Sequence, residues 1–194
     1  MNGIGPDQAR LLEAHRIRWE FGFNDPTLIG WLTVAGYILA AVLAWRSASA
    51  ARQAGTEFDR IFWLAICSAM TLLAVNKQLD LHVLVTDIGR YWAVQNDLYQ
   101  QRRAFQKAFI AAIVLGAGGA GLALWLATRG KDGSLRLAVA GLAVCCGYIL
   151  VRAACFHHAD VLMRTQLLGL RWDGFVELAG VATVALAAWR YRPG

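Results

Sequence analysis

Long apolar segments are the feature that most constrains what this chain can fold into. Hydrophobic residues make up 58% of its 194 residues and charged residues only 16%. A helix needs roughly 20 mainly apolar residues to cross a bilayer, because lipid offers the backbone no hydrogen-bond partner. Several segments meet this requirement. The composition therefore excludes an ordinary water-soluble domain, and the length suits a single membrane domain.

The apolar segments predict the number of spans. Four have the required length: Leu28 to Trp45, Ile61 to Val85, Ala108 to Thr128 and Leu135 to Phe156. A fifth, Phe175 to Trp189, is shorter, but it ends in tryptophan, arginine and tyrosine residues typical of an interfacial anchor. We therefore predict an all-α polytopic membrane helical bundle of about five transmembrane helices, formed by residues 27–194.

The N-terminal region, residues 1–26, differs from the rest. Between Ala9 and Phe23, charged residues alternate with apolar ones at helical spacing, which predicts an amphipathic segment lying on the membrane surface. Residues 1–19 contain no apolar core of a cleavable signal peptide. We expect the first transmembrane helix to direct its own insertion.

The charge distribution indicates topology rather than nucleic-acid binding. The formal net charge is +6, but the basic residues are dispersed between apolar segments and form no stripe, so no nucleic-acid partner is expected. The loops at 46–60 and 129–136 and the C-terminal tail are net basic. The positive-inside rule therefore favours an outer N-terminus and a cytoplasmic C-terminus.

Small residues also have predicted roles. Residues 116–121 match the dinucleotide fingerprint GxGxxG, but they lie in the middle of an apolar span, where no strand turns into a helix. We interpret them as positions where neighbouring helices approach closely. The four cysteines all lie in apolar segments and are expected to be packing residues.

Ionisable residues gather near the ends of three predicted spans. An ionisable side chain within a span costs about 2.5 to 3.5 kcal/mol, so several together require partners or a function. The second and fourth spans run in the same direction, and both have such residues near their C-terminal ends, whereas the fifth span begins with them. All three groups should therefore meet at one membrane face. The residues are Lys77, Asp80, Arg152, His157, Asp160, Arg164 and Glu177.

These residue types suit a metal-assisted reaction. Carboxylates and imidazoles bind Zn²⁺ or a similar divalent ion, which can produce hydroxide near neutral pH. The predicted metal ligands are Asp80, His157, Asp160 and Glu177, and the first three are also the predicted catalytic residues. The leading hypothesis is a membrane-embedded hydrolase that acts on an amphiphilic substrate taken from membrane lipid.

Three basic residues would bind the substrate in this hypothesis. Lys77, Arg152 and Arg164 could hold an anionic group such as a phosphate or carboxylate.

Two alternatives remain open. The charges could instead neutralise one another as a structural network or docking face in a noncatalytic accessory subunit, whose partners would be other membrane subunits. The second alternative is a b-type haem protein, in which His82 and either His157 or His158 provide the axial ligands.

Three sequence strings resemble known membrane proteins. NKQLDL at 76–81, FHHAD at 156–160 and ELAG at 177–180 resemble a group of small bacterial multi-span membrane proteins, over roughly the second to the fifth span. This resemblance implies the bacterial inner membrane. The chain also has a looser similarity to ceramidase- and progestin-receptor-like membrane hydrolases. This similarity implies a zinc ion held by intramembrane histidine and aspartate residues.

Overall fold

The computed structural model describes residues 27–79, 102–154 and 170–193, with short pieces at 84, 87–89, 91 and 166–167. The described part of the chain is all-helical except for one two-residue pairing, in which β1 (Gln166–Leu167) lies antiparallel to β2 (Leu170–Arg171). The predicted amphipathic segment in residues 1–26 lies outside the described residues.

The predicted helical character of the apolar segments is confirmed where the structure describes them. The long helices are α2 (Leu28–Gln53), α3 (Glu57–Leu79), α5 (Arg102–Ala127), α6 (Gly133–Ala154) and α8 (Trp172–Arg190). The largest boundary difference is at the end of α2, which continues past Trp45 through residues expected to form a loop. Residues 46–53 are rich in alanine and arginine, which are strong helix formers, so the helix continues beyond its apolar part.

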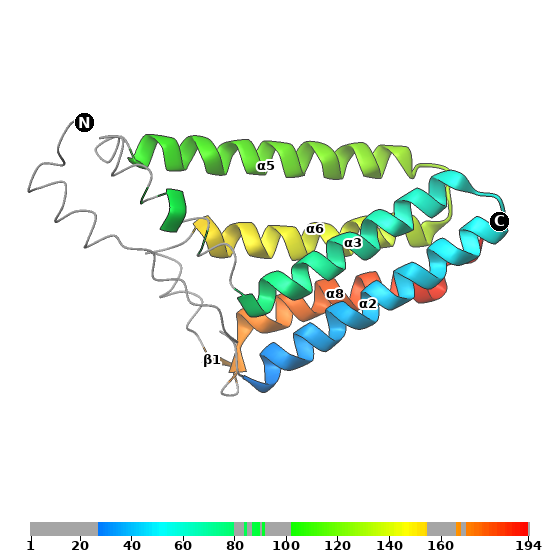
Figure 1. Ribbon diagram of the computed structural model, residues 1–194, viewed down its shortest axis with the longest axis horizontal. Coiled ribbons are helices and arrows are strands. Elements are labelled where there is room, and N and C mark those ends of the chain that lie inside the picture. The colour runs from blue at the N-terminus through cyan, green and yellow to red at the C-terminus, as the bar shows by residue number, and fades with distance from the viewer. Residues whose placement is uncertain are drawn as a thin grey trace, which may run out of the picture.

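Short turns make consecutive helices antiparallel. Thr27 caps α2, since its Oγ1 accepts a 3.0 Å hydrogen bond from the backbone N–H of Gly30. Gly55 ends the turn after α2 with φ 73°, and Gly130 lies between α5 and α6 with φ 79°, a conformation that favours glycine. Both turns and the C-terminus lie at the same end of the bundle (Figure 1).

The helices pack in the order α3, α2, α8, α6, α5. Among the described elements, α2 contacts α3 and α8 extensively, α8 also contacts α6, and α5 packs on α6 at the edge (Figure 1). Ser47 links two of these helices, because its hydroxyl lies 2.9 Å from the carbonyl oxygen of Ala188 in α8. Such small polar residues commonly hold membrane helices together.

The outer surface of the bundle is apolar. Among the described residues, three helical segments are long and apolar enough to cross a membrane: Leu28–Gln53, Glu57–Leu79 and Gly133–Leu150. The segment Val114–Ala127 in α5 is apolar but shorter. Large apolar side chains point outward, including Leu72, Leu115 and Trp189. This surface suits an integral membrane protein, since lipid covers such side chains without cost.

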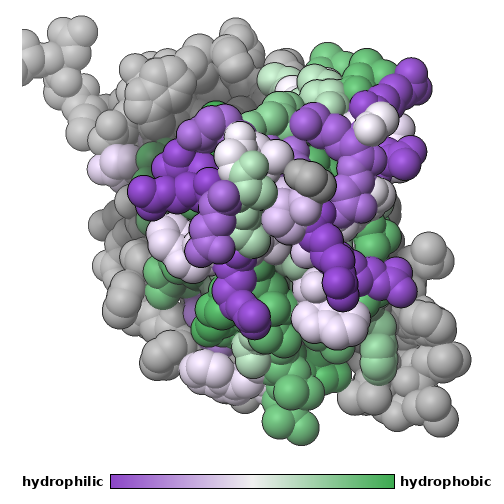
Figure 2. Space-filling view, turned by 90° about the vertical axis from the view of Figure 1, so that its right-hand side faces the viewer, coloured by the Kyte–Doolittle hydropathy of each residue, from purple (hydrophilic) through white to green (hydrophobic). Residues whose placement is uncertain are grey.

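The end that carries the turns and the C-terminus is polar and net basic. Figure 2 views the molecule from this end and shows hydrophilic side chains gathered over it. The basic residues of the turns and flanking helix ends are Arg52, Arg60, Arg129, Lys131, Arg136, Arg190 and Arg192, and the acidic ones are Glu57, Asp59 and Asp132. We call this surface the basic end.

Candidate functional site

A buried ion pair lies away from the basic end. Lys77 is in the last turn of α3, and its Nζ donates a 2.8 Å hydrogen bond to Oε2 of Glu177, near the start of α8. The side chains are only 9% and 3% exposed. The expectation that ionisable residues from separate helices meet at one end of the bundle is therefore confirmed for this pair.

Tyr37 of α2 completes a three-helix contact. Its hydroxyl donates a 3.0 Å hydrogen bond to Oε1 of Glu177, and the tyrosine side chain is fully buried. Each carboxylate oxygen thus accepts a hydrogen bond from a different helix. We call Tyr37, Lys77 and Glu177 the polar triad.

Mutual neutralisation explains how these charges tolerate burial. A single buried charge is very costly, but an opposite charge at hydrogen-bond distance offsets much of that cost. The hydroxyl of Tyr37 adds a charge-assisted hydrogen bond on the remaining oxygen, so Glu177 is bound on both sides. Removal of Lys77 would leave the buried Glu177 carboxylate without the ammonium that offsets its charge, which typically costs about 3 to 5 kcal/mol.

Glycines bring α8 close to α6 and so position Glu177. A Cβ added at Gly180 would lie 2.7 Å from Sγ of Cys145, and one added at Gly141 would lie 2.8 Å from Cγ2 of Val184. Contacts that short do not occur, so both positions require glycine for this helix spacing. Cys145 is fully buried in this interface, consistent with the packing role predicted for the cysteines.

The predicted close-approach role of residues 116–121 is not fulfilled within the described structure. A Cβ added at Gly116, Gly118, Gly119 or Gly121 would have no neighbour within 4 Å. The reason is position, since α5 lies at the edge of the bundle and packs on α6 through other residues. Gly141 and Gly180 perform this role instead.

Most of the predicted site lies beyond the described residues. Of the predicted catalytic, metal-binding and substrate-binding side chains, only Lys77 and Glu177 are described, and the structure brings these two together. Arg152 is in the last turn of α6, but its side chain is outside the described part. Also outside it are Asp80, His82, His157, His158, Asp160 and Arg164.

The described residues provide only a partial fit to a metal site. Among them, no group of three or more histidine, cysteine, aspartate or glutamate side chains is placed to hold a metal ion. Glu177 has a hydrogen bond on each oxygen, although a carboxylate oxygen has two lone pairs and could accept another partner. Hydrogen-bonded carboxylates are common among metal ligands, so the contacts of Glu177 suit a ligand that is held in place.

Sequence reasoning missed Tyr37. The residue is the sole tyrosine in the apolar segment from Leu28 to Trp45, where tryptophans lie near the ends. A buried tyrosine hydroxyl usually has a hydrogen-bond partner, so a tyrosine in the interior of a span indicates a polar partner on another helix. That signal shows that a partner exists without identifying Glu177.

A second buried polar contact ties the basic end together. Asp59, at the start of α3, accepts a 2.8 Å hydrogen bond from the hydroxyl of Tyr191, and its Oδ1 lies 3.3 Å from Nζ of Lys131. The Tyr191 ring also packs against Trp63, with ring centroids 5.3 Å apart. Burial, together with the hydrogen bond to Asp59, raises the pKa of Tyr191 to about 12. This contact joins the segment after α8 to the start of α3 and to the turn between α5 and α6.

Comparison with known proteins identifies no relative. The chain matches no family model, no curated protein and no solved structure.

Proposed function

We propose that the chain is a membrane-embedded enzyme acting on an amphiphilic substrate at the end of the bundle where the polar triad lies. The observation that supports this proposal is the Lys77–Glu177 pair, in which two nearly buried charges from α3 and α8 lie 2.8 Å apart. Ionisable residues inside a membrane bundle are costly and commonly mark functional sites.

The proposed topology has five spans in the bacterial inner membrane. It adds α5 and α8 to the three helices that meet the length and hydropathy requirement. Alternating helix directions support it, because the described turns and the C-terminus share the basic end. By the positive-inside rule the basic end faces the cytoplasm, so the polar triad lies towards the outer leaflet.

The proposed reaction is a metal-assisted hydrolysis. Asp80, His157 and Asp160, with Glu177, would hold a divalent ion such as zinc, and that ion would supply Lewis-acid activation and a water of lowered pKa. The hydroxyl of Tyr37 and the ammonium of Lys77 would keep the Glu177 carboxylate oriented.

The basic residues have a role in substrate binding under this proposal. An anionic substrate group would compete with Glu177 for Lys77, whereas Arg152 and Arg164 would contribute further positive charge. Binding of such a group would therefore loosen the polar triad, and release would restore it.

Metal analysis of protein purified in detergent tests this function. We expect a stoichiometric divalent metal in the wild type and its loss in both Asp80→Ala and His157→Ala. An Asp132→Ala variant at the basic end is the matched control and should keep the metal. Metal-free wild-type protein, with both site variants folding normally, would contradict the proposal.

A noncatalytic accessory subunit is the second candidate. It is favoured by the two hydrogen bonds on Glu177, which satisfy the described part of the polar cluster without any ligand. On this alternative, the paired substitution Lys77→Met with Glu177→Gln preserves function, and the protein copurifies with other membrane chains. Loss of function in the paired variant, with intact folding and no copurifying chains, would count against it.

A further inference from the structure

Most basic side chains of the basic end have no acidic partner among the described residues. Glu57 is already bound by Arg60, with 2.8 Å between nitrogen and oxygen. Asp59 is bound by Lys131 at 3.3 Å. Asp132 forms no ion pair within the described part of the chain. The basic residues left over are all exposed, and we call them the unpaired arginines: Arg52, Arg129, Arg136, Arg190 and Arg192.

The unpaired arginines lie on neighbouring helix ends. Arg52 is in the last turn of α2 and Arg190 in the last turn of α8. Arg129 follows α5, and Arg136 is in the first turn of α6. Since α8 packs against both α2 and α6, these positive charges gather on one surface, where they repel one another. A negatively charged partner would relieve that repulsion and would be attracted to this surface.

The residue type favours phosphate as the partner group. Every unpaired basic side chain of the basic end is an arginine, whereas its lysine, Lys131, is paired with Asp59. A guanidinium presents its N–H donors in a planar fork that matches two oxygens of one phosphate, and it stays charged at any physiological pH. The unpaired arginines therefore have the donor geometry of a phosphate-binding surface.

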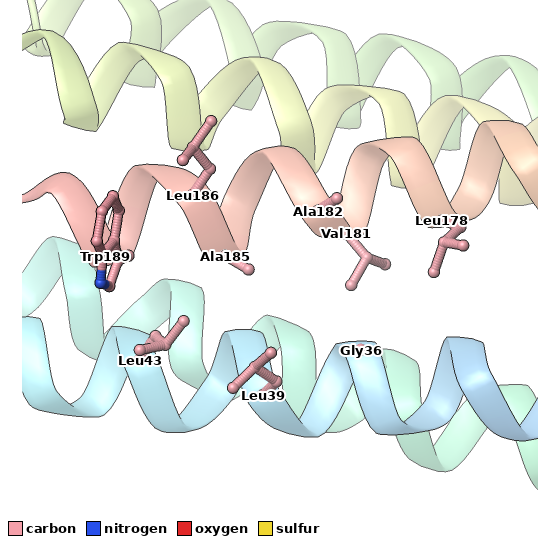
Figure 3. A pocket seen from close by; sticks show the side chains of 9 residues that line it. All are labelled: Gly36, Leu39, Leu43, Leu178, Val181, Ala182, Ala185, Leu186 and Trp189. Carbon is pink, nitrogen blue, oxygen red and sulfur yellow. The ribbon is translucent and has the colours of Figure 1, made fainter.

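Exposed tryptophans border the unpaired arginines on three helices. They are Trp45 in α2, Trp125 in α5 and Trp189 in α8. Trp189 lies at the end of an apolar groove between α2 and α8, whose other lining residues are glycine or aliphatic, and Arg190 follows it directly (Figure 3). Arg129 follows Trp125 by one helical turn. Tryptophans concentrate at the level of lipid headgroups, so the arginines next to them lie at the level of the lipid phosphates.

We propose that the basic end binds the phosphate groups of anionic phospholipids through its unpaired arginines. The position beside the tryptophans favours a lipid over a soluble phosphate or an acidic protein, because lipid phosphates already lie in that layer. Anionic lipids are favoured over zwitterionic ones, since the cation of a zwitterionic headgroup is repelled by the arginines.

This lipid-binding surface goes beyond the proposed hydrolase and shares no residue with it. The polar triad lies at the other end of the bundle, and the basic end would bind anionic lipid in whichever leaflet it occupies. The proposal requires only that the apolar helices span a membrane. Metal loss in Asp80→Ala is independent of lipid preference, so the two proposals can fail separately.

Competition between two lipids tests the proposal. Detergent-purified protein is mixed with equal amounts of phosphatidylglycerol and phosphatidylcholine with identical acyl chains, and native mass spectrometry counts the lipids that stay bound. We expect phosphatidylglycerol to be favoured about fivefold or more, the factor that one arginine near an anionic headgroup contributes. Glycerol phosphate, which lacks the chains, should not displace it at equal concentration.

Paired substitutions assign the effect to the unpaired arginines. Arg190→Gln with Arg192→Gln should lower the preference about fivefold or more, whereas lysine at both positions should retain most of it. The matched control is Glu57→Gln with Arg60→Gln, which removes an arginine that already has a partner and leaves the net charge unchanged. It should keep the wild-type preference. All four side chains lie on the surface or in an exposed pair, and thermal unfolding verifies that each variant folds.

A second pair of substitutions, Arg129→Gln with Arg136→Gln, tests the α5–α6 side of the basic end. Equal binding of the two lipids by the wild type, or an unchanged preference in both arginine pairs, would overturn the proposal. Displacement of the lipid by glycerol phosphate would also overturn it and would indicate a site for soluble phosphate. Binding of a polyglutamate peptide without any lipid preference would assign the surface to an acidic protein instead.

Discussion

Lys77 and Glu177 are 100 residues apart in the sequence, yet Nζ of the lysine lies 2.8 Å from Oε2 of the glutamate. The pair joins the last turn of α3 to the beginning of α8, and Tyr37 binds the same carboxylate from α2. Three helices thus share one buried carboxylate. This contact fixes their relative positions at the end of the bundle opposite the basic end.

Single neutralisation of the ion pair should destabilise the fold. Glu177→Ala removes the carboxylate that binds both the Lys77 ammonium and the Tyr37 hydroxyl, so we expect the free energy of unfolding to fall by about 3 kcal/mol or more. The paired variant Lys77→Met with Glu177→Gln should recover much of this loss. Thermal unfolding in detergent measures both effects.

The exposed pair formed by Arg60 and Glu57 is the control for that comparison. Its side chains are 36% and 67% exposed, and solvent screens their attraction. Glu57→Ala should change stability by less than about 1 kcal/mol. Equal effects of Glu57→Ala and Glu177→Ala would contradict the assigned role of the buried pair.

Tyr37→Phe removes one hydroxyl from the polar triad and keeps the ring. Hydrogen bonds to charged groups contribute about 1.5 to 3 kcal/mol, so we expect a loss in that range. Its effect should be much smaller in a Glu177→Gln background, where the acceptor has no charge. A double-mutant cycle measured by thermal unfolding checks this, and strict additivity would show that Tyr37 does not act through Glu177.

Alanine substitutions at glycines should have opposite effects at two positions. Gly180→Ala places a Cβ 2.7 Å from Sγ of Cys145, so α6 and α8 must move apart, at a cost of about 1 to 3 kcal/mol. Gly118→Ala meets nothing within 4 Å in the described structure and should stabilise α5 by up to about 1 kcal/mol through helix propensity. Thermal unfolding of the two variants checks the contrast, and a destabilising Gly118→Ala would indicate a partner on that face.

Alkaline pH should weaken the contact at the basic end. The folded-state pKa of Tyr191 is about 12, above its ordinary value of 10, because of burial and its hydrogen bond to Asp59. Tyr191 therefore stabilises the fold fully below pH 10, and this contribution is lost as the pH rises from 10 towards 12. The drop in unfolding temperature between pH 9 and pH 11 should be smaller in Tyr191→Phe than in the wild type. Identical drops would refute this assignment.

Chain direction was sufficient to predict that Lys77 and Glu177 lie at the same end of the bundle. A lysine at the end of one span and a glutamate at the beginning of a span that runs back must lie at the same level of an antiparallel bundle. Apolar segment lengths likewise predicted the helices, because a membrane-spanning backbone must satisfy its own hydrogen bonds. These inferences depend only on residue order along the chain.

Lateral packing could not be predicted in the same way. Which helices are neighbours depends on how their surfaces fit, and hydropathy is similar on every side of a lipid-facing helix. The sequence therefore suggested close packing at residues 116–121, whereas the close contacts occur at Gly141 and Gly180. Tyr37 was missed for the same reason, since its partner depends on α2 lying beside α8.

The sequence by itself determined that this chain forms helices, several of them long and apolar enough to cross a membrane, because a bare backbone is so costly to transfer into lipid. Only the tertiary structure decided that Glu177 pairs with Lys77 and Tyr37. Such pairings depend on the rotation and spacing of neighbouring helices. Side-chain packing across the whole bundle determines both.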